Sequence, residues 1–164
     1  MSRVPEWPEP VGRVAAVLRV GAIDATIQEF PQGTPTAEQA ARAVGCRLEQ
    51  IVKTLVLVCD GEYVLALVPG DRRADERKIA AEMGAREVRV ARAEEVVEAT
   101  GFDPGSVAPF PRRPEVAVLI ERTLLQHQQV WIGAGSSRHM AVLAPSDLQI
   151  LAGARGADLV ATAG

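Results

Sequence analysis

The feature that most constrains the fold is an apolar run followed by a tight turn in the middle of the chain. Residues Ile51 to Cys59 are nearly all β-branched or aliphatic, which predicts a strand that is buried on both faces. Asp60-Gly61 is a hairpin dipeptide, and Glu62 to Val68 then returns as a second apolar strand. The sequence therefore predicts a sheet built around this hairpin and covered by other elements.

The segments around the hairpin alternate between helical and extended patterns. We expect helices at 11–20, 36–44, 75–83, 93–100 and 146–151, a helical turn at 123–127, and further strands at 26–30, 87–90, 116–121, 130–133 and 140–143. This spacing is not that of regular βαβ units, so the pattern predicts an α/β fold with a mixed sheet and packed helices. The length favours a single domain over 1–164, with a loose proline-containing arm at 1–10.

Charge and hydropathy limit the partners of the chain. A formal net charge of −3 excludes the coating of nucleic acid by bulk electrostatics, so a polyanion would have to meet a local basic patch. Arg72-Arg73 with Arg77-Lys78, and Arg112-Arg113 beside a proline-rich loop, are candidates, although such pairs are also typical of solvated surface. Because no apolar run could span a bilayer and residues 1–9 lack a signal-peptide core, we expect a cytoplasmic protein with neither membrane nor DNA as a partner.

A stiff loop, Gly105-Ser106-Val107-Ala108-Pro109-Phe110, is the first candidate for a site. The prolines at positions 104, 109 and 111 fix φ and remove backbone donors, while Gly105 opens conformations that other residues avoid. A loop held in this way can aim its remaining N–H groups, from Gly105 to Ala108, at a carbonyl oxygen or a phosphate. The alternative is a proline-rich surface turn between two elements.

Lys53 is the second candidate, because a lysine two residues into a buried strand has to extend to the surface or meet an anion. The third is Gly133-Ala134-Gly135-Ser136-Ser137-Arg138-His139, where the glycines admit a ligand and the polar side chains supply donors. A flexible hairpin would have a similar sequence, and His139 could also be a structural histidine. The segment is neither a Walker loop nor a dinucleotide fingerprint.

The sequence contains no recognisable pattern for a metal site, a disulfide framework or a serine nucleophile. Two histidines, together with Cys46 and Cys59, form no recognisable metal site or disulfide framework, and no nucleophile elbow is present. We therefore expect no metal and no cofactor.

Together the three candidate stretches resemble the YbaK/EbsC family of trans-acting aminoacyl-tRNA deacylases, which is related to the editing insertion of bacterial prolyl-tRNA synthetase. The resemblance covers about residues 24–160. It rests on Lys53-Thr54-Leu55, on the loop from Gly105 to Phe110, and on Val130-Trp131-Ile132-Gly133-Ala134-Gly135 ahead of Ser146-Asp147-Leu148. It implies a compact α/β fold with a mixed, partly barrel-like sheet. It also implies hydrolysis of the ester that joins a wrong small amino acid, of the cysteine or alanine class, to tRNA-Pro.

The resemblance also implies roles for particular residues. The catalytic set is Lys53, Gly105, Ser106, Val107 and Ala108, and the substrate-binding set is Thr54, Pro109, Phe110, Gly133, Gly135, Ser136 and His139. An activated ester needs only donors for the developing oxyanion and a positioned water or substrate nucleophile. Our hypothesis is that the amides of residues 105–108 polarise the ester carbonyl while Lys53 anchors the ribose–phosphate end or assists that polarisation.

Two other functions remain open at this stage. A non-catalytic module that binds aminoacyl-tRNA or a nucleotide-like ligand would use the same donors, and loss of hydrolysis with retained tRNA binding would identify it. A partner-docking domain would instead show an exposed apolar patch. For the deacylase, the expected partners are the acceptor end of an aminoacyl-tRNA and, in addition, a tRNA synthetase. The sequence leaves open the amino acid, the tRNA, the oligomeric state and whether a synthetase partner is required.

Overall fold

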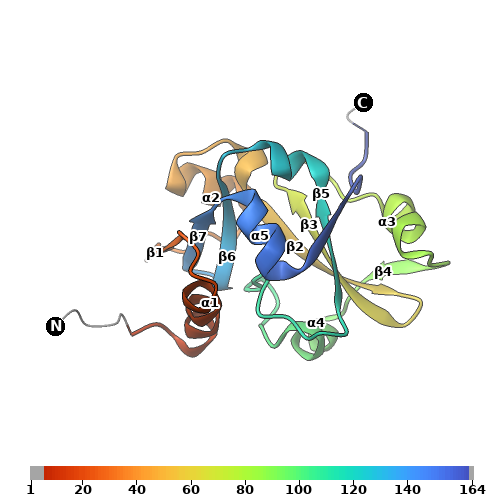
Figure 1. Cartoon of the computed structure of the whole chain (residues 1–164), viewed down its shortest axis with the longest axis horizontal. Coiled ribbons are helices and arrows are strands. Elements are labelled where there is room, and N and C mark those ends of the chain that lie inside the picture. The colour runs from red at the N-terminus through yellow and green to blue at the C-terminus, as the bar shows by residue number, and fades with distance from the viewer. Residues whose placement is uncertain (1–5, 163–164) are drawn as a thin grey trace.

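The predicted hairpin forms the middle of a five-stranded sheet in the computed structural model, which describes residues 6–162 (Figure 1). Strand β2 (Val52–Cys59) pairs antiparallel with β3 (Glu62–Pro69). Asp60 and Gly61 have φ values of 49° and 84°, as a type I′ turn requires. The Asp60 carboxylate also accepts hydrogen bonds from the amides of Arg86 and Glu87, which ties the turn to the segment before β4.

The remaining strands of this sheet are β4 (Val88–Val90), β5 (Ala117–Glu121) and β8 (Ala154–Ala157), in the order β4-β2-β3-β5-β8. Because β5 runs parallel to β3 and β8 runs parallel to β5, the sheet is mixed. The sequence did not predict β8. Its residues Ala-Arg-Gly-Ala have no β-branched side chain, and they become a strand by pairing with the edge of β5.

A second, antiparallel sheet contains β1 (Thr26–Glu29), β7 (His139–Leu143) and β6 (Val130–Ser136), in that order. The two sheets meet where Ile51, just before β2, forms a parallel bridge with Trp131 of β6. Within residues 6–162 the strands thus curve around a common core as two sheets, without closing into a barrel. The predicted α/β fold class is confirmed, although the strands are divided between two sheets.

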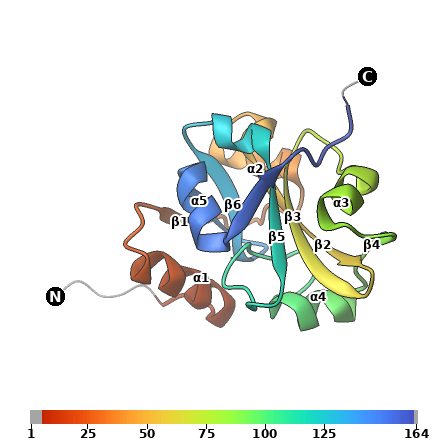
Figure 2. The ribbon, with the colours of Figure 1, turned by 45° about the vertical axis from the view of Figure 1, so that its right-hand side comes forward.

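Five helices pack around the sheets in the described part of the chain (Figures 1 and 2): α1 (Glu9–Val20), α2 (Ala37–Val44), α3 (Glu76–Met83), α4 (Ala93–Thr100) and α5 (Pro145–Ala152). Short 3-10 turns lie at Leu48–Gln50 and Arg122–Gln126. Thr36 caps α2 and Asp75 caps α3, since the Gln39 amide donates to the Thr36 hydroxyl at 3.1 Å and the Arg77 amide donates to the Asp75 carboxylate.

The loose arm was predicted at 1–10, but residues 9 and 10 already belong to α1, where a proline in the first turn is tolerated. Residues 1–5 of that arm lie outside the described residues. No helix in the described part is both long enough and apolar enough to cross a membrane.

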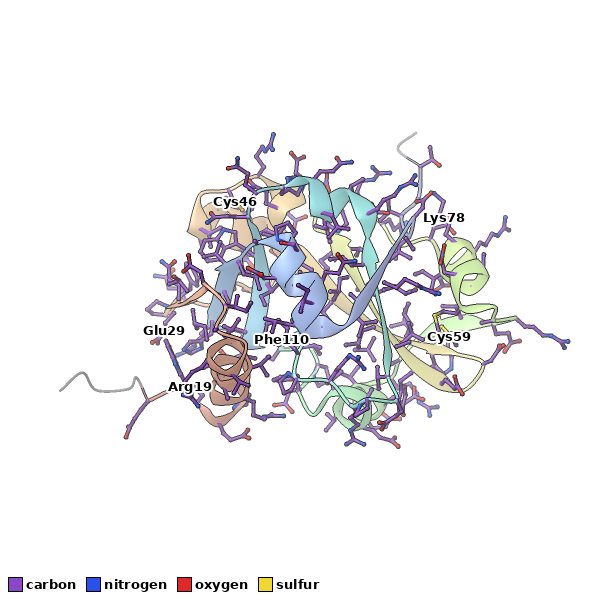
Figure 3. The ribbon with its side chains drawn as sticks, viewed as in Figure 1. Arg19, Glu29, Cys46, Cys59, Lys78 and Phe110 are labelled. Atoms are coloured by element: carbon purple, nitrogen blue, oxygen red, sulfur yellow. The ribbon has the colours of Figure 1, made fainter. Side chains whose placement is uncertain are left out.

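The hairpin buries side chains on both of its faces, as predicted. Val52 and Val56 point into one core with Phe110, which lies near the centre of Figure 3, while Leu57 and Cys59 face a second core with Ile79. Alternation along β2 therefore places Thr54 on the face of Val52, and Lys53 on the opposite face. The two cysteines lie at opposite sides of the molecule as free thiols (Figure 3).

Candidate active site

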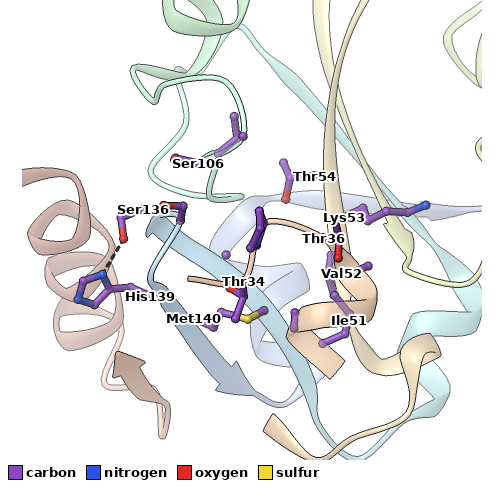
Figure 4. A pocket seen from close by; sticks show the side chains of 17 residues that line it. Thr34, Thr36, Ile51, Val52, Lys53, Thr54, Ser106, Ser136, His139 and Met140 are labelled. Carbon is purple, nitrogen blue, oxygen red and sulfur yellow. Dashed lines mark hydrogen bonds between the residues drawn. The ribbon is translucent and has the colours of Figure 1, made fainter. Parts of the chain in front are cut away.

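A pocket of about 200 Å³ lies where four segments that are distant in the sequence come together (Figure 4). These segments are the turn into α2, the start of β2, the stiff loop, and the end of the β6–β7 hairpin. The lining residues are Thr34, Pro35, Thr36, Ala37, Ala40, Ile51, Val52, Lys53, Thr54, Gly105, Ser106, Val107, Gly133, Ser136, Ser137, His139 and Met140. The structure therefore brings the three candidate stretches together at one site.

The lining has an apolar part and a polar part. Ala37 and Ala40 of α2 join Ile51 and Met140 in one apolar cluster. Hydroxyl groups, backbone and a histidine form the rest, and none of the described residues that line the pocket is an aspartate or a glutamate. The sequence analysis did not identify the apolar part, because small aliphatic residues on a helix are also typical of an ordinary core.

Thr54 contributes a hydroxyl without a partner. Its Oγ1 atom is buried and forms no hydrogen bond within the described structure, while its strand face borders the pocket. An unsatisfied buried hydroxyl costs about 1–3 kcal/mol.

Lys53 lines the same pocket, but its ammonium group points away from Ser136 and His139 (Figure 4). The Nζ atom donates to the carbonyl oxygen of Arg72 at 2.8 Å in a half-buried position. Arg72 in turn donates to the carbonyl of Ala161. The lysine thus neither extends freely into solvent nor meets an anion in this structure; its charge is held at the pocket rim by a backbone carbonyl.

The stiff loop divides into an anchor and a lining part. Ala108 and Phe110 are buried in the main core, and Pro109 is buried between them, so these three residues hold the loop from behind. Gly105, with φ of 82°, Ser106 and Val107 border the pocket.

The amides of this loop are not all available. The Ser106 amide donates to the Asp103 carbonyl at 2.9 Å, which closes a turn. The amides of Gly105, Val107 and Ala108 have no hydrogen-bond partner among residues 6–162. Three of the four predicted donors therefore have no partner within the described residues, and two of them, the amides of Gly105 and Val107, belong to residues that line the pocket.

The glycine-rich segment is not the turn that the sequence predicted. Strand β6 continues through Ser136 with a bulge after Gly133, because Ser136 still pairs with His139 of β7. Gly133 borders the pocket, where a Cβ atom would lie 3.3 Å from the Val107 carbonyl oxygen. Gly135 has φ of 100° and lies against the start of α1, where a Cβ would be 2.8 Å from the Pro10 carbonyl oxygen. The two glycines therefore serve different purposes.

Ser136 and His139 form a side-chain pair at the pocket. The Ser136 Oγ atom lies 2.6 Å from Nδ1 of His139, and the Arg138 amide donates to the same oxygen at 3.0 Å. His139 is buried, with 5% of its surface exposed. Its ring meets Trp7 edge to face at 5.5 Å, and its Nε2 lies 4.0 Å from the Glu29 carboxylate. Sequence reasoning missed Trp7 and Glu29, which lie far from the motifs.

The predicted basic pairs are largely structural. Arg112 donates to the carbonyls of Ala152 and Val116, which holds the segment after the stiff loop against α5. Arg72 is bound to Ala161, as described above. Within residues 6–162, no group of three or more His, Cys, Asp and Glu side chains is arranged to hold a metal ion.

Fold and site together define an α/β domain with a small, half-polar pocket that faces free backbone amides. Residues 31–151 match the model of the aminoacyl-tRNA editing domain family, and the chain belongs to this family. The match contains every residue that lines the pocket, whereas Trp7 and Glu29 lie outside it. The resemblance to YbaK-like proteins is thereby confirmed.

Similar proteins agree with this assignment. The uncharacterized protein YwhH of Bacillus subtilis (strain 168) is 32% identical over 123 residues, which cover 74% of this chain and 78% of that protein. A proline–tRNA ligase of Citrifermentans bemidjiense is 37% identical over 92 residues, or 56% of this chain, but the match spans only 16% of the ligase. A crystal structure described as a candidate trans-editing enzyme for prolyl-tRNA synthetase has a TM-score of 0.88 and 34% identity, covering 96% of this chain and all of that one.

Proposed function

We propose that this editing domain is a trans-acting deacylase, which hydrolyses the ester of a wrongly attached small amino acid, of the cysteine or alanine class, on tRNA-Pro. The observation that carries the proposal is the juxtaposition of free loop amides with a small pocket that has one apolar part. The chain would act as one domain in the cytoplasm on the acceptor end of the tRNA, and a synthetase would supply the mischarged substrate.

The amides of Gly105, Val107 and Ala108 would polarise the ester carbonyl. As a nucleophile adds to the carbonyl carbon, negative charge develops on the oxygen, and preorganised N–H groups stabilise that charge without reorganisation. The nucleophile is a positioned water or a group of the substrate itself, such as the cysteinyl thiol. The Ser106 amide, already bound to Asp103, would hold the loop in shape instead.

Size would select the amino acid. With about 200 Å³ shared between the ester and its side chain, the cluster of Ala37, Ala40, Ile51 and Met140 accommodates a small apolar group. A bulky side chain would clash with these buried residues, because a packed wall relaxes only at a cost. The Thr54 hydroxyl would complete its hydrogen bonding on the ester or the ribose.

Lys53 would bind the ribose–phosphate end. Its ammonium lies at the rim, on a neutral carbonyl acceptor that an anionic phosphate can replace. A binding module without turnover would use the same donors, and it would bind the tRNA without releasing the amino acid.

The test is the release of amino acid from tRNA-Pro charged with cysteine, alanine or proline, for the wild type and Lys53→Ala. We expect hydrolysis of a small ester by the wild type and its loss in Lys53→Ala, with unchanged circular dichroism. No release from any ester with enzyme in excess would refute the deacylase on these substrates. Retained tRNA binding in that case would identify the binding module.

A further inference from the structure

We infer that the Ser136 hydroxyl is the acceptor for the free α-amino group of the substrate, and that Trp7 positions it through His139. This inference rests on the proposed function. It assigns a specific recognition role within the site, and it brings in a residue outside the part that matches the editing-domain family.

The Ser136 hydroxyl proton is directed to His139. The Glu29 carboxylate lies 4.0 Å from Nε2 of His139, so the tautomer with a proton on Nε2 is favoured. In that tautomer Nδ1 is an acceptor, and the Ser136 hydroxyl 2.6 Å away donates its proton to it.

The Ser136 hydroxyl has limited hydrogen-bonding capacity left for a ligand. A serine oxygen has one proton and two acceptor positions. The hydroxyl proton is donated to Nδ1 of His139, and one acceptor position receives the Arg138 amide at 3.0 Å. One acceptor position of the Ser136 oxygen therefore remains. Because Ser136 borders the pocket, its contribution there is that of an acceptor and not of a donor.

The α-ammonium group is the part of an aminoacyl ester that needs such an acceptor. The ester carbonyl is itself an acceptor, whereas the α-ammonium carries three donors. No carboxylate is present among the described residues that line the pocket, so neutral oxygens have to receive these donors. An oxygen that two other hydrogen bonds already fix can accept from the ammonium group without a further loss of side-chain conformational entropy on binding.

Trp7 holds the His139 ring in place. Its ring meets the His139 ring at 5.5 Å with an interplanar angle of 89°, and His139 is buried beneath it. An edge-to-face aromatic contact fixes the orientation of the imidazole. Trp7 thus acts on the substrate only through the imidazole and Ser136, as a positioning residue.

The experiment compares two esters on the same tRNA-Pro, alanyl and propionyl, which differ in the amino group alone. We measure kcat/KM for the wild type, Ser136→Ala and the control Ser146→Ala, whose exposed side chain lies in α5 outside the pocket and forms no hydrogen bond in residues 6–162. Ser136→Ala should lower the rate for alanyl ester by about tenfold to a hundredfold, as for a hydrogen bond to a charged group, and leave the propionyl rate unchanged. Ser146→Ala should change neither rate.

Trp7→Ala should lower the alanyl rate selectively in the same way but by a smaller factor, and Trp7→Phe should restore it. An equal loss on both esters in Ser136→Ala would overturn the inference, because the hydroxyl would then serve the attacking water or the fold. No loss on either ester would overturn it as well. If the wild type hydrolyses neither these esters nor the cysteinyl ester and its desamino analogue, the proposed function itself fails, which is a distinct result.

Discussion

The stiff loop and the β6–β7 hairpin face each other across the pocket, and they contribute to it by different means. The loop from Gly105 to Phe110 is irregular, so it leaves the amides of Gly105, Val107 and Ala108 unpaired. In the hairpin, the backbone groups are used in strand pairing, so its contribution to the pocket is the side chains of Ser136 and His139. Free backbone donors therefore come from a segment whose amides are not paired in a sheet, provided that buried side chains fix its position.

The largest expected effect tests how the loop is held. Phe110→Ala would remove a fully buried ring from the main core, which costs about 3–5 kcal/mol of unfolding free energy for this type of change. Urea unfolding monitored by circular dichroism measures the loss. If the stability were unchanged, the loop would not be anchored by this side chain.

The two glycines of the hairpin separate stability from activity. Gly135→Ala places a Cβ 2.8 Å from the Pro10 carbonyl at φ of 100°, so we expect a destabilisation of about 2–4 kcal/mol. Gly133→Ala meets the Val107 carbonyl at 3.3 Å, inside the pocket lining, and should reduce hydrolysis with little change in stability. The reverse pattern in thermal unfolding and deacylation assays would contradict the different roles assigned to these glycines.

Thr54→Val should change stability and activity in opposite directions. Replacing the unpartnered hydroxyl by a methyl group of similar shape removes a buried polar group, which stabilises the fold by about 1 kcal/mol. The same change removes a ligand contact and should lower kcat/KM about tenfold. Denaturant midpoints and single-turnover rates test the two halves separately, and a gain in both would show that Thr54 is purely structural.

The smallest effect on deacylation is expected for Glu95 of α4, which binds Arg89 of the edge strand β4. Hydrogen bonds from the Arg89 guanidinium, and then from the Arg92 amide, lower the pKa of Glu95 to about 2. Because the folded pKa lies below the ordinary value of 4.5, this carboxylate stabilises the fold at neutral pH, and the contribution is lost as the pH falls from about 4.5 to about 2.

Glu95→Gln should therefore flatten the acid limb of the stability curve in that interval while leaving deacylation at neutral pH unchanged. Unfolding at several pH values tests the first part. A loss of activity at neutral pH would show that this end of the sheet is coupled to the pocket.

Local signals predicted most of the fold. Gly45, Gly84 and Gly101 follow the predicted helices and end them in the left-handed region, and Asp60-Gly61 makes the predicted hairpin turn. Strand β8 and the extension of β6 to Ser136 were missed, because pairing with a neighbouring strand creates them and their own residues have low strand propensity.

The site was only partly predictable. The motifs identified the loop, Lys53 and Thr54, but only the tertiary structure showed that the Lys53 ammonium donates to the Arg72 carbonyl. Ala40 and Met140 look like ordinary core residues until tertiary structure places them beside the loop amides. Gly135 carries the same signal as Gly133, yet packing against α1 explains it.

The central claim is that free amides of the stiff loop stabilise the oxyanion, and replacement of Val107 by its α-hydroxy acid tests it most directly. This change removes the N–H group and keeps the side chain, and the same replacement at Ser106, whose amide donates to Asp103, is the matched control. Under single-turnover conditions with the small ester that the wild type hydrolyses, the account predicts a loss of about 10²–10³-fold at Val107, as for an oxyanion donor, with unchanged stability. It predicts a much smaller loss of rate at Ser106, with lower stability. An unchanged rate at Val107 would contradict the account.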